Sequence, residues 1–545
     1  MKFHISPSPL HPYFLDFKIS FVCKTDDTLI KLPLWRPGRY QVQTFAKNIR
    51  NIGAESNGKA FKVRNVSRNT WSVLGSKEGD EIILHYEYYA RHQDAGGTWV
   101  SNDFWLINGI GCGMLPEGLD QEEIDVIIDF PVNFEVATAA IKKADSYHFS
   151  NFEEWTETPF MAGSKMHHQS FVMEDSTFHI WLHGNIQPDW TQIVTDFKKF
   201  TQVQLDIFGG FPHSEFHYLC LIPSFRHYHG VEHPTSTVIT LGPATDFNDT
   251  TFYENLLGIS SHELFHVWNI KGIRPKELKP YPLFEEVYFD TGYVAEGVTT
   301  YFGDEILYRS GAYSKEQYKN ELNKLLTRHF ENQGRYALSV ADSSLELWTD
   351  GYEKGIPARK TSIYVKGAVA ALILDSMIKT KFDDQKSLDD VMKLMWERFG
   401  ENSLGYTSED YKAIAEEVFE ASLDEYFNNV IFGTDLLEDK VQEALHHLGW
   451  ETEVNFPKEA LAKYYGLKVD TKGIIVDTAA RKTSQDLVEG DKIISINDIV
   501  GSVDSYQKMA SQNDVLKVIY ERDSQIFTKE LYKKKELYFA KINVT

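Results

Sequence analysis

The amino-acid sequence predicts a multidomain α+β protein, with an all-β domain first, a mainly helical domain in the middle and a small strand-rich domain last. The chain has 545 residues, more than one hydrophobic core normally organises. Apolar and polar residues alternate at its start and again near its end, as in β-strands. In the middle, apolar residues recur three and four positions apart, as in helices. We place the predicted domains at residues 1–175, 176–452 and 453–545.

The first predicted domain contains short segments rich in aromatic and β-branched residues, such as "FLDFKISFVC" and "EIILHYEYYA". Gly, Pro, Asn and Asp separate these segments, and all four residue types favour turns. The pattern therefore predicts a sandwich-like domain built from β-strands.

The second predicted domain begins where the period changes. The segments "QIVTDFKKFTQVQLDIF" and "NLLGISSHELFHVWNI" have helical spacing, as does much of 300–447. The third domain returns to strands in the run from "YYGLKV" to "GDKIISIND". A short helical piece, "SVDSYQKMAS", and two more strands complete it.

Charge and composition exclude several classes of partner. The net charge is −23, so the long-range field repels phosphate backbones and anionic lipids, and we expect neither nucleic acid nor membrane as a partner. No apolar run approaches the ~18 residues that span a bilayer. The opening residues lack the apolar stretch of a signal peptide, and the three cysteines are scattered. These features predict a cytoplasmic protein without a disulfide framework.

The segment "SSHELFHVWN" carries the strongest chemical signal. On a helix, residues four apart share a face, so His262 and His266 can bind one metal ion while Glu263 lies beside them as a general base. With 19 histidines in the chain, this motif also arises by chance, so a third ligand has to be identified.

A catalytic zinc takes three protein ligands and leaves one position for water. In "TGYVAEGVTTYFGDEIL" the apolar residues recur at helical spacing, and Glu296 lies in the first turn on another face. Spacing alone leaves Glu285, Glu286 and Glu305 as competing third ligands.

The strings "HELFHVWNIKGIRP" and "AEGVTTYF" resemble the glycyl aminopeptidase family of gluzincin zinc metallopeptidases. The resemblance covers nearly the whole chain, because "LWRPGRY", "GVEHPTSTVI" and a terminal PDZ-like segment follow in the family's order. It implies a thermolysin-like catalytic domain, one Zn²⁺ per chain on His262, His266 and Glu296, and Glu263 as the base. It also implies removal of N-terminal residues, especially Gly and Ala, from peptides with a free N-terminus. Asn269 and Arg274 match family positions, without an assigned role.

A second resemblance concerns substrate binding. In the related alanyl-type aminopeptidases a Gly-x-x-Glu-Asn stretch lies along the substrate, and the resemblance makes the stretch Gly230, Val231, Glu232 and His233 the corresponding edge here. This implies that Glu232 binds the substrate's α-amino group. The chain has His233 where those relatives have Asn.

Hydrolysis also requires a donor for the oxyanion on the attacked carbonyl. The same relatives place a tyrosine in a Tyr-x-Lys-Gly pattern, which occurs twice here, at Tyr352 and Tyr364. Tyr364 precedes a strongly apolar helical segment, whereas Pro357 follows Tyr352 and favours a loop. We therefore assign the oxyanion donor to Tyr364 and keep Tyr352 as the alternative.

The segment "VEGDKIISIND" resembles the Gly-Asp turn and strand of PDZ domains. PDZ domains bind a peptide as an added strand and hold its carboxylate with backbone amides. The loop at Tyr465, Gly466 and Leu467 matches poorly, so both a PDZ peptide ligand and a purely architectural role stay open. A zinc endopeptidase with a PDZ recruiting domain and a non-catalytic PDZ adaptor remain alternative functions.

Overall fold

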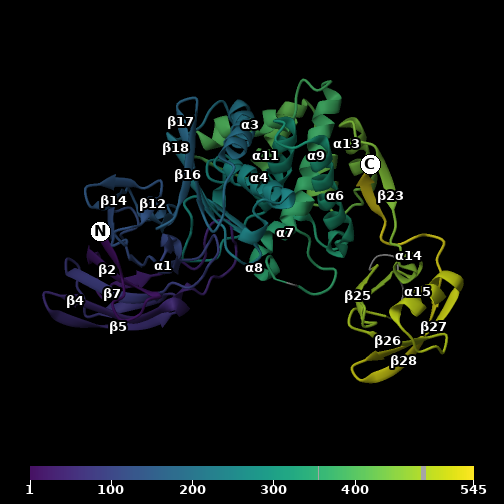
Figure 1. Cartoon of the computed structure of the whole chain (residues 1–545), viewed down its shortest axis with the longest axis horizontal. Coiled ribbons are helices and arrows are strands. Elements are labelled where there is room, and N and C mark those ends of the chain that lie inside the picture. Colours follow the sequence, from purple (N-terminus) through teal and green to yellow (C-terminus); the bar gives the residue numbers. More distant parts are fainter. Residues whose placement is uncertain (354, 480–486) are drawn as a thin grey trace. The chain divides into compact units, whose positions relative to one another are not determined.

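The computed structural model describes residues 1–353, 355–479 and 487–545. The multidomain α+β prediction is confirmed: the N-terminal part is rich in β-structure and the middle contains many helices (Figure 1). The chain forms two compact units whose segments alternate along the sequence. The first unit comprises Met1–Phe289, Phe302–Ser314 and Asp389–Tyr411, and the second comprises Asp290–Tyr301, Lys315–Leu388 and Lys412–Thr545.

The N-terminal part is built on an 11-stranded and a 4-stranded sheet. In the larger sheet, β2 (Phe14–Val22) pairs antiparallel with β7 (Glu81–Tyr89) and β1 (Lys2–Pro7). Alternate residues of β2 and β7 are buried, which explains the apolar alternation of the sequence. A short helix, α2 (Phe152–Thr156), follows the last strand of this sheet, and Asn151 caps it by accepting from the Glu154 N–H.

A 5-stranded sheet follows, in the order β16-β17-β18-β20-β19. Sequence reasoning did not identify β18, because a continuously buried parallel strand shows no alternation. Helix α3 (Trp190–Phe208) connects β17 to β18. The antiparallel β19 forms the edge of the sheet, next to helix α4 (Thr250–Phe265). The strands are β16 (His167–Met173), β17 (Ser176–His183), β18 (Glu215–Leu221), β19 (His227–Glu232) and β20 (Ser236–Gly242).

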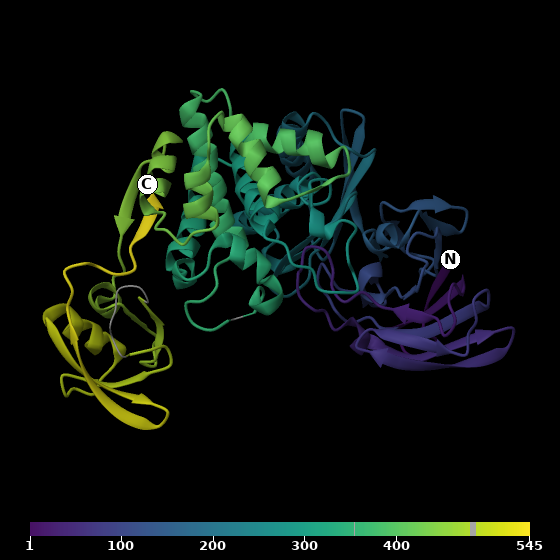
Figure 2. The same cartoon turned by 180° about the vertical axis from the view of Figure 1, so that it is seen from behind.

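In the second unit, helix α9 (Ile363–Lys381) packs against α6 (Lys315–Glu331), and the two lie side by side in Figures 1 and 2. It also crosses the π-helical turn η4 (Tyr293–Val298) at a pair of glycines. A Cβ added to Gly297 would lie 2.5 Å from the Cα of Gly367, so only glycine allows this approach.

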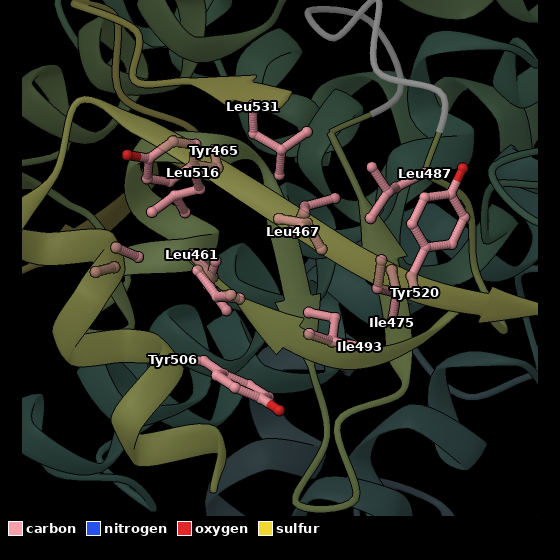
Figure 3. Packing of buried hydrophobic residues seen from close by; sticks show 14 residues of the cluster. Leu461, Tyr465, Leu467, Ile475, Leu487, Ile493, Tyr506, Leu516, Tyr520 and Leu531 are labelled. Carbon is pink, nitrogen blue, oxygen red and sulfur yellow. The ribbon is translucent and has the colours of Figure 1, made fainter. Parts of the chain in front are cut away.

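The C-terminal part surrounds an apolar cluster that includes Leu467, Ile493 and Leu516 (Figure 3). Helix α15 (Val503–Gln512) forms where the sequence predicts a helical piece. Residues 480–486 of the predicted strand run lie outside the described residues. The final strand β29 (Lys541–Val544) pairs with β23 (Thr452–Asn455) beside the helices of this unit (Figure 2). The described part of the chain contains no helix with the length and apolar character needed to cross a membrane. Assignment of this part as a PDZ domain stays a prediction.

Candidate active site

Helix α4 carries the two histidines of the HExxH motif at its C-terminal end. His266 follows the helix as its cap with helical backbone angles, so its side chain stays on the face of His262, and the two Nε2 atoms lie 3.0 Å apart. His266 Nδ1 lies 2.9 Å from the carbonyl oxygen of Asn269. A carbonyl only accepts hydrogen bonds, so Nδ1 carries the proton and Nε2 keeps a lone pair directed at His262. Burial and the neighbouring His266 hold the pKa of His262 well below its ordinary value, which keeps this imidazole neutral.

Glu263 lies against the edge strand β19. Thr237 Oγ1 donates to Glu263 Oε2 at 3.4 Å. A Cβ added to Gly230 would lie only 2.0 Å from Glu263 Oε1, so glycine is required for this contact. The side chain of Val231 points to the opposite face of the strand, into an apolar cluster. Val231 can therefore meet a substrate only through its main chain.

Glu232 lies two positions after Gly230 and so faces the same side of β19. Its side chain is buried, and among the described residues its Oε1 has no hydrogen-bond partner. A Cβ added to Gly38 would lie 2.4 Å from Glu232 Oε2, and Gly38 has a φ of +77°, so two independent constraints select glycine there. Burial raises the pKa of Glu232, but Lys271, with smaller contributions from other neighbouring groups such as Arg36, outweighs burial and holds the pKa below its ordinary value.

The segment after α4 forms two ion pairs with α2, one to a residue in its first turn and one to the residue that caps its C-terminus. Lys271 Nζ lies 2.5 Å from Glu157 Oε2, and Arg274 Nη1 lies 2.7 Å from Glu153 Oε1. Sequence reasoning gave Arg274 no role and did not single out the other three residues. The two residues of each ion pair are more than a hundred positions apart in the sequence, so no local pattern marks either contact. Only Lys271 and Arg274 lie in a motif that the sequence singled out. The two pairs hold α2 against the segment that follows the histidines.

In the second unit, the buried Glu296 belongs to η4, next to the Gly297 that contacts α9. Tyr364 is the second residue of α9, whose N-terminus is capped by Ser362 Oγ accepting from the Val365 N–H. Tyr352 lies in a turn after α8 (Leu347–Asp350), as its sequence predicts. The competing carboxylates Glu285 and Glu286 are exposed, and Glu305 forms an ion pair with Arg309.

Two further groups in the first unit have the residue types of a metal site. One is His179, Glu215 and His217, which we call the sheet cluster, and the other is Asp94, His227 and His229. In one, Trp181 Nε1 donates to His217 Nδ1 at 3.2 Å, and in the other Arg36 Nη2 donates to His229 Nε2 at 3.0 Å. Tryptophan and arginine can only donate, so each neutral ring carries its proton on the other nitrogen, which faces the carboxylate of its group. That nitrogen has no lone pair for a metal.

Comparison with known proteins defines the class. Residues 255–370 match the M61 glycyl aminopeptidase family, and residues 2–164 match the peptidase M61 N-terminal domain. The protein is therefore a peptidase. More particularly, it carries the domains of the M61 glycyl aminopeptidase family.

The fold also resembles solved structures. An aminopeptidase N family protein from Idiomarina loihiensis superimposes with a TM-score of 0.86 at 24% identity, over 100% of this chain and 98% of that chain. An M1 zinc metallopeptidase from Deinococcus radiodurans gives a TM-score of 0.49 at 12% identity, over 80% of this chain and 93% of that chain. No curated protein matches the chain in sequence.

Proposed function

We propose that the protein is a zinc-dependent aminopeptidase that removes N-terminal residues, chiefly small ones such as Gly and Ala, from peptides. The observation that carries this proposal is the convergence of His262 and His266 beside Glu263, with their Nε2 atoms 3.0 Å apart. A neutral imidazole whose Nδ1–H is held by a backbone carbonyl is the form that ligates zinc through Nε2.

Glu296 is the proposed third ligand. The family resemblance of the "AEGVTTYF" segment assigns it this role, and its side chain is buried in η4. The turn η4 runs directly into α5 (Thr299–Arg309), where a Cβ added to Gly303 would lie 3.3 Å from His262 Cβ. Two imidazoles and a carboxylate are a common ligand set for catalytic Zn²⁺. When bound, zinc supplies a Lewis acid that brings the pKa of water toward ~7.

The remaining steps belong to side chains of this protein. Glu263 takes the proton of the attacking water and passes it to the leaving amine. The Tyr364 hydroxyl donates a hydrogen bond to the oxyanion that forms on the scissile carbonyl. Glu232 binds the substrate's α-ammonium group, so the first peptide bond lies beside Glu263. Glu232 Oε1 lies on the same face of β19 as Gly230 and makes no hydrogen bond to any described residue, which supports this role.

The test compares glycine p-nitroanilide with its N-acetyl derivative. Acetylation removes the ammonium charge, so we expect at least ~10²-fold lower kcat/KM, as for the loss of a desolvated charge partner. Glu232→Ala should lower kcat/KM for the free substrate and close this gap. If the wild type cleaves acetylated and free substrates equally well, the amine anchor is wrong and an endopeptidase on the same zinc site takes its place.

A further inference from the structure

Glu232 is buried together with three other ionisable side chains, Glu157, His233 and Lys271. They come from α2, from β19 and its following turn, and from the segment after α4, and none is more than 7% exposed. Lys271 Nζ lies between two carboxylates, 2.5 Å from Glu157 Oε2 and 3.8 Å from Glu232 Oε1. His233 Nδ1 lies 3.9 Å from the same Glu157 oxygen.

The charges of this group do not balance. Burial, together with the charge of Lys271, holds the pKa of His233 well below its ordinary value, so this ring is neutral. Burial raises the pKa of Glu157, and its partner Lys271 opposes that rise. When both carboxylates are ionised, Glu157 and Glu232 share the single ammonium of Lys271, which leaves one negative charge in excess. Arg36, the next cation, donates instead to the Pro37 carbonyl and to His229. A buried excess charge is strongly unfavourable without a partner, so the group is suited to receive one cation.

The position of Lys271 decides where that cation binds. A direct ammonium–carboxylate hydrogen bond is ~2.8 Å long, so a shift of about 1 Å would bring Lys271 from Glu157 onto Glu232. In the observed arrangement Lys271 pairs with Glu157, and Glu232 Oε1 has no hydrogen-bond partner among the described residues.

We propose that Glu157 is a positioning residue for the amine-binding site: it holds the Lys271 ammonium and so leaves Glu232 available to the α-ammonium of a peptide. This inference rests on the proposed function, in which Glu232 is the amine anchor. It gives a role to Lys271 in the "HVWNIKGIRP" motif and to the end of α2, through which the N-terminal part reaches the catalytic segment.

The fold supports this role because α2 is anchored independently of Lys271. The Glu157 N–H donates to the Glu153 carbonyl at 2.9 Å, and the Glu153 side chain pairs with Arg274. Glu153→Gln is therefore a matched control: it removes an ion pair between the same two segments without releasing Lys271.

The test measures kcat and KM for glycine p-nitroanilide and inhibition by glycinamide in the full-length protein. Glu157→Gln should let Lys271 pair with Glu232, so KM and the glycinamide inhibition constant should rise at least ~10-fold while kcat changes little, because ground-state binding is lost. The double variant Glu157→Gln/Lys271→Met removes the competing ammonium and should restore KM to within ~3-fold of wild type. Glu153→Gln should leave KM unchanged.

An unchanged KM in Glu157→Gln would overturn the proposal. A double variant as impaired as the single variant would overturn it too, since Glu157 would then act only as a structural link. Failure of the proposed function gives a different result: the wild type would cleave N-acetylglycine p-nitroanilide and the free substrate equally well. Discrimination by the wild type without a Glu157 effect would refute only the role of Glu157.

Discussion

Two groups of histidines in the first unit contain similar ligand types but differ in the hydrogen bonds that hold them. The first group is His262 and His266 at the end of α4, which we call the helix pair. Here His266 donates from Nδ1 to the carbonyl of Asn269, so its Nε2 lone pair faces His262. In the sheet cluster, His217 accepts at Nδ1 from the indole of Trp181, so its proton lies on the nitrogen inside the cluster.

The difference shows that residue type and proximity do not define a metal site. The ligand atoms of the sheet cluster lie within 4.8 Å of one another, yet the hydrogen bond from Trp181 to His217 Nδ1 places the His217 proton on Nε2, which faces Glu215. A single hydrogen-bond partner, a carbonyl in one case and an indole in the other, determines which ring nitrogen can bind a cation. We therefore expect zinc on the helix pair and not on the sheet cluster.

The largest contrast is expected when one histidine is removed from each group. His266→Ala should reduce bound zinc from about one per chain to nearly none and kcat/KM to less than about one-thousandth, since metal and activity are lost together. His217→Ala should keep both. Metal analysis and kinetics on the same preparations decide the matter, and zinc loss in the His217 variant would place the metal in the sheet cluster.

A smaller contrast separates metal binding from proton transfer. Glu263→Gln should retain zinc but lower kcat by roughly 10³–10⁴-fold, because the base is lost while the ligands remain. Glu215→Gln makes the same change in the sheet cluster and should leave kcat unaltered. Near-normal turnover in the Glu263 variant would show that another group accepts the proton.

The two Tyr-x-Lys-Gly segments of the second unit provide the next contrast. Tyr364→Phe should lower kcat by ~10²–10³-fold with little change in KM, as for one lost oxyanion donor. Tyr352→Phe should change kcat little. The reverse pattern in steady-state kinetics would reassign the oxyanion donor to Tyr352.

The smallest effect concerns stability and pH. Burial, together with the neighbouring imidazoles of His217 and His168, lowers the pKa of His179 from 6.5 to about 4. The unfolded chain therefore binds this proton first, so stability should decline as the pH falls from 6.5 to 4, by well under ~1.4 kcal/mol per pH unit because the ring is partly exposed to solvent. His179→Gln should flatten this part of the curve in thermal melts. An unchanged slope would mean that His179 does not contribute.

Helix spacing predicted the His262–His266 pair, because residues four apart on one helix need no tertiary information. Helical spacing likewise indicated the segment around Glu296, and alternation indicated the large β-rich part. In contrast, β18 is buried on both faces and gave no periodic signal. The ion pair between Glu157 and Lys271 joins residues 114 positions apart, and nothing local marks such a contact.

The central claim is that zinc on the helix pair drives peptide hydrolysis, and a metal titration tests it most directly. Protein stripped with a chelator should lose cleavage of glycine p-nitroanilide and regain it in proportion to added Zn²⁺, with an end point near one ion per chain. Full activity in protein shown to be metal-free would contradict the claim.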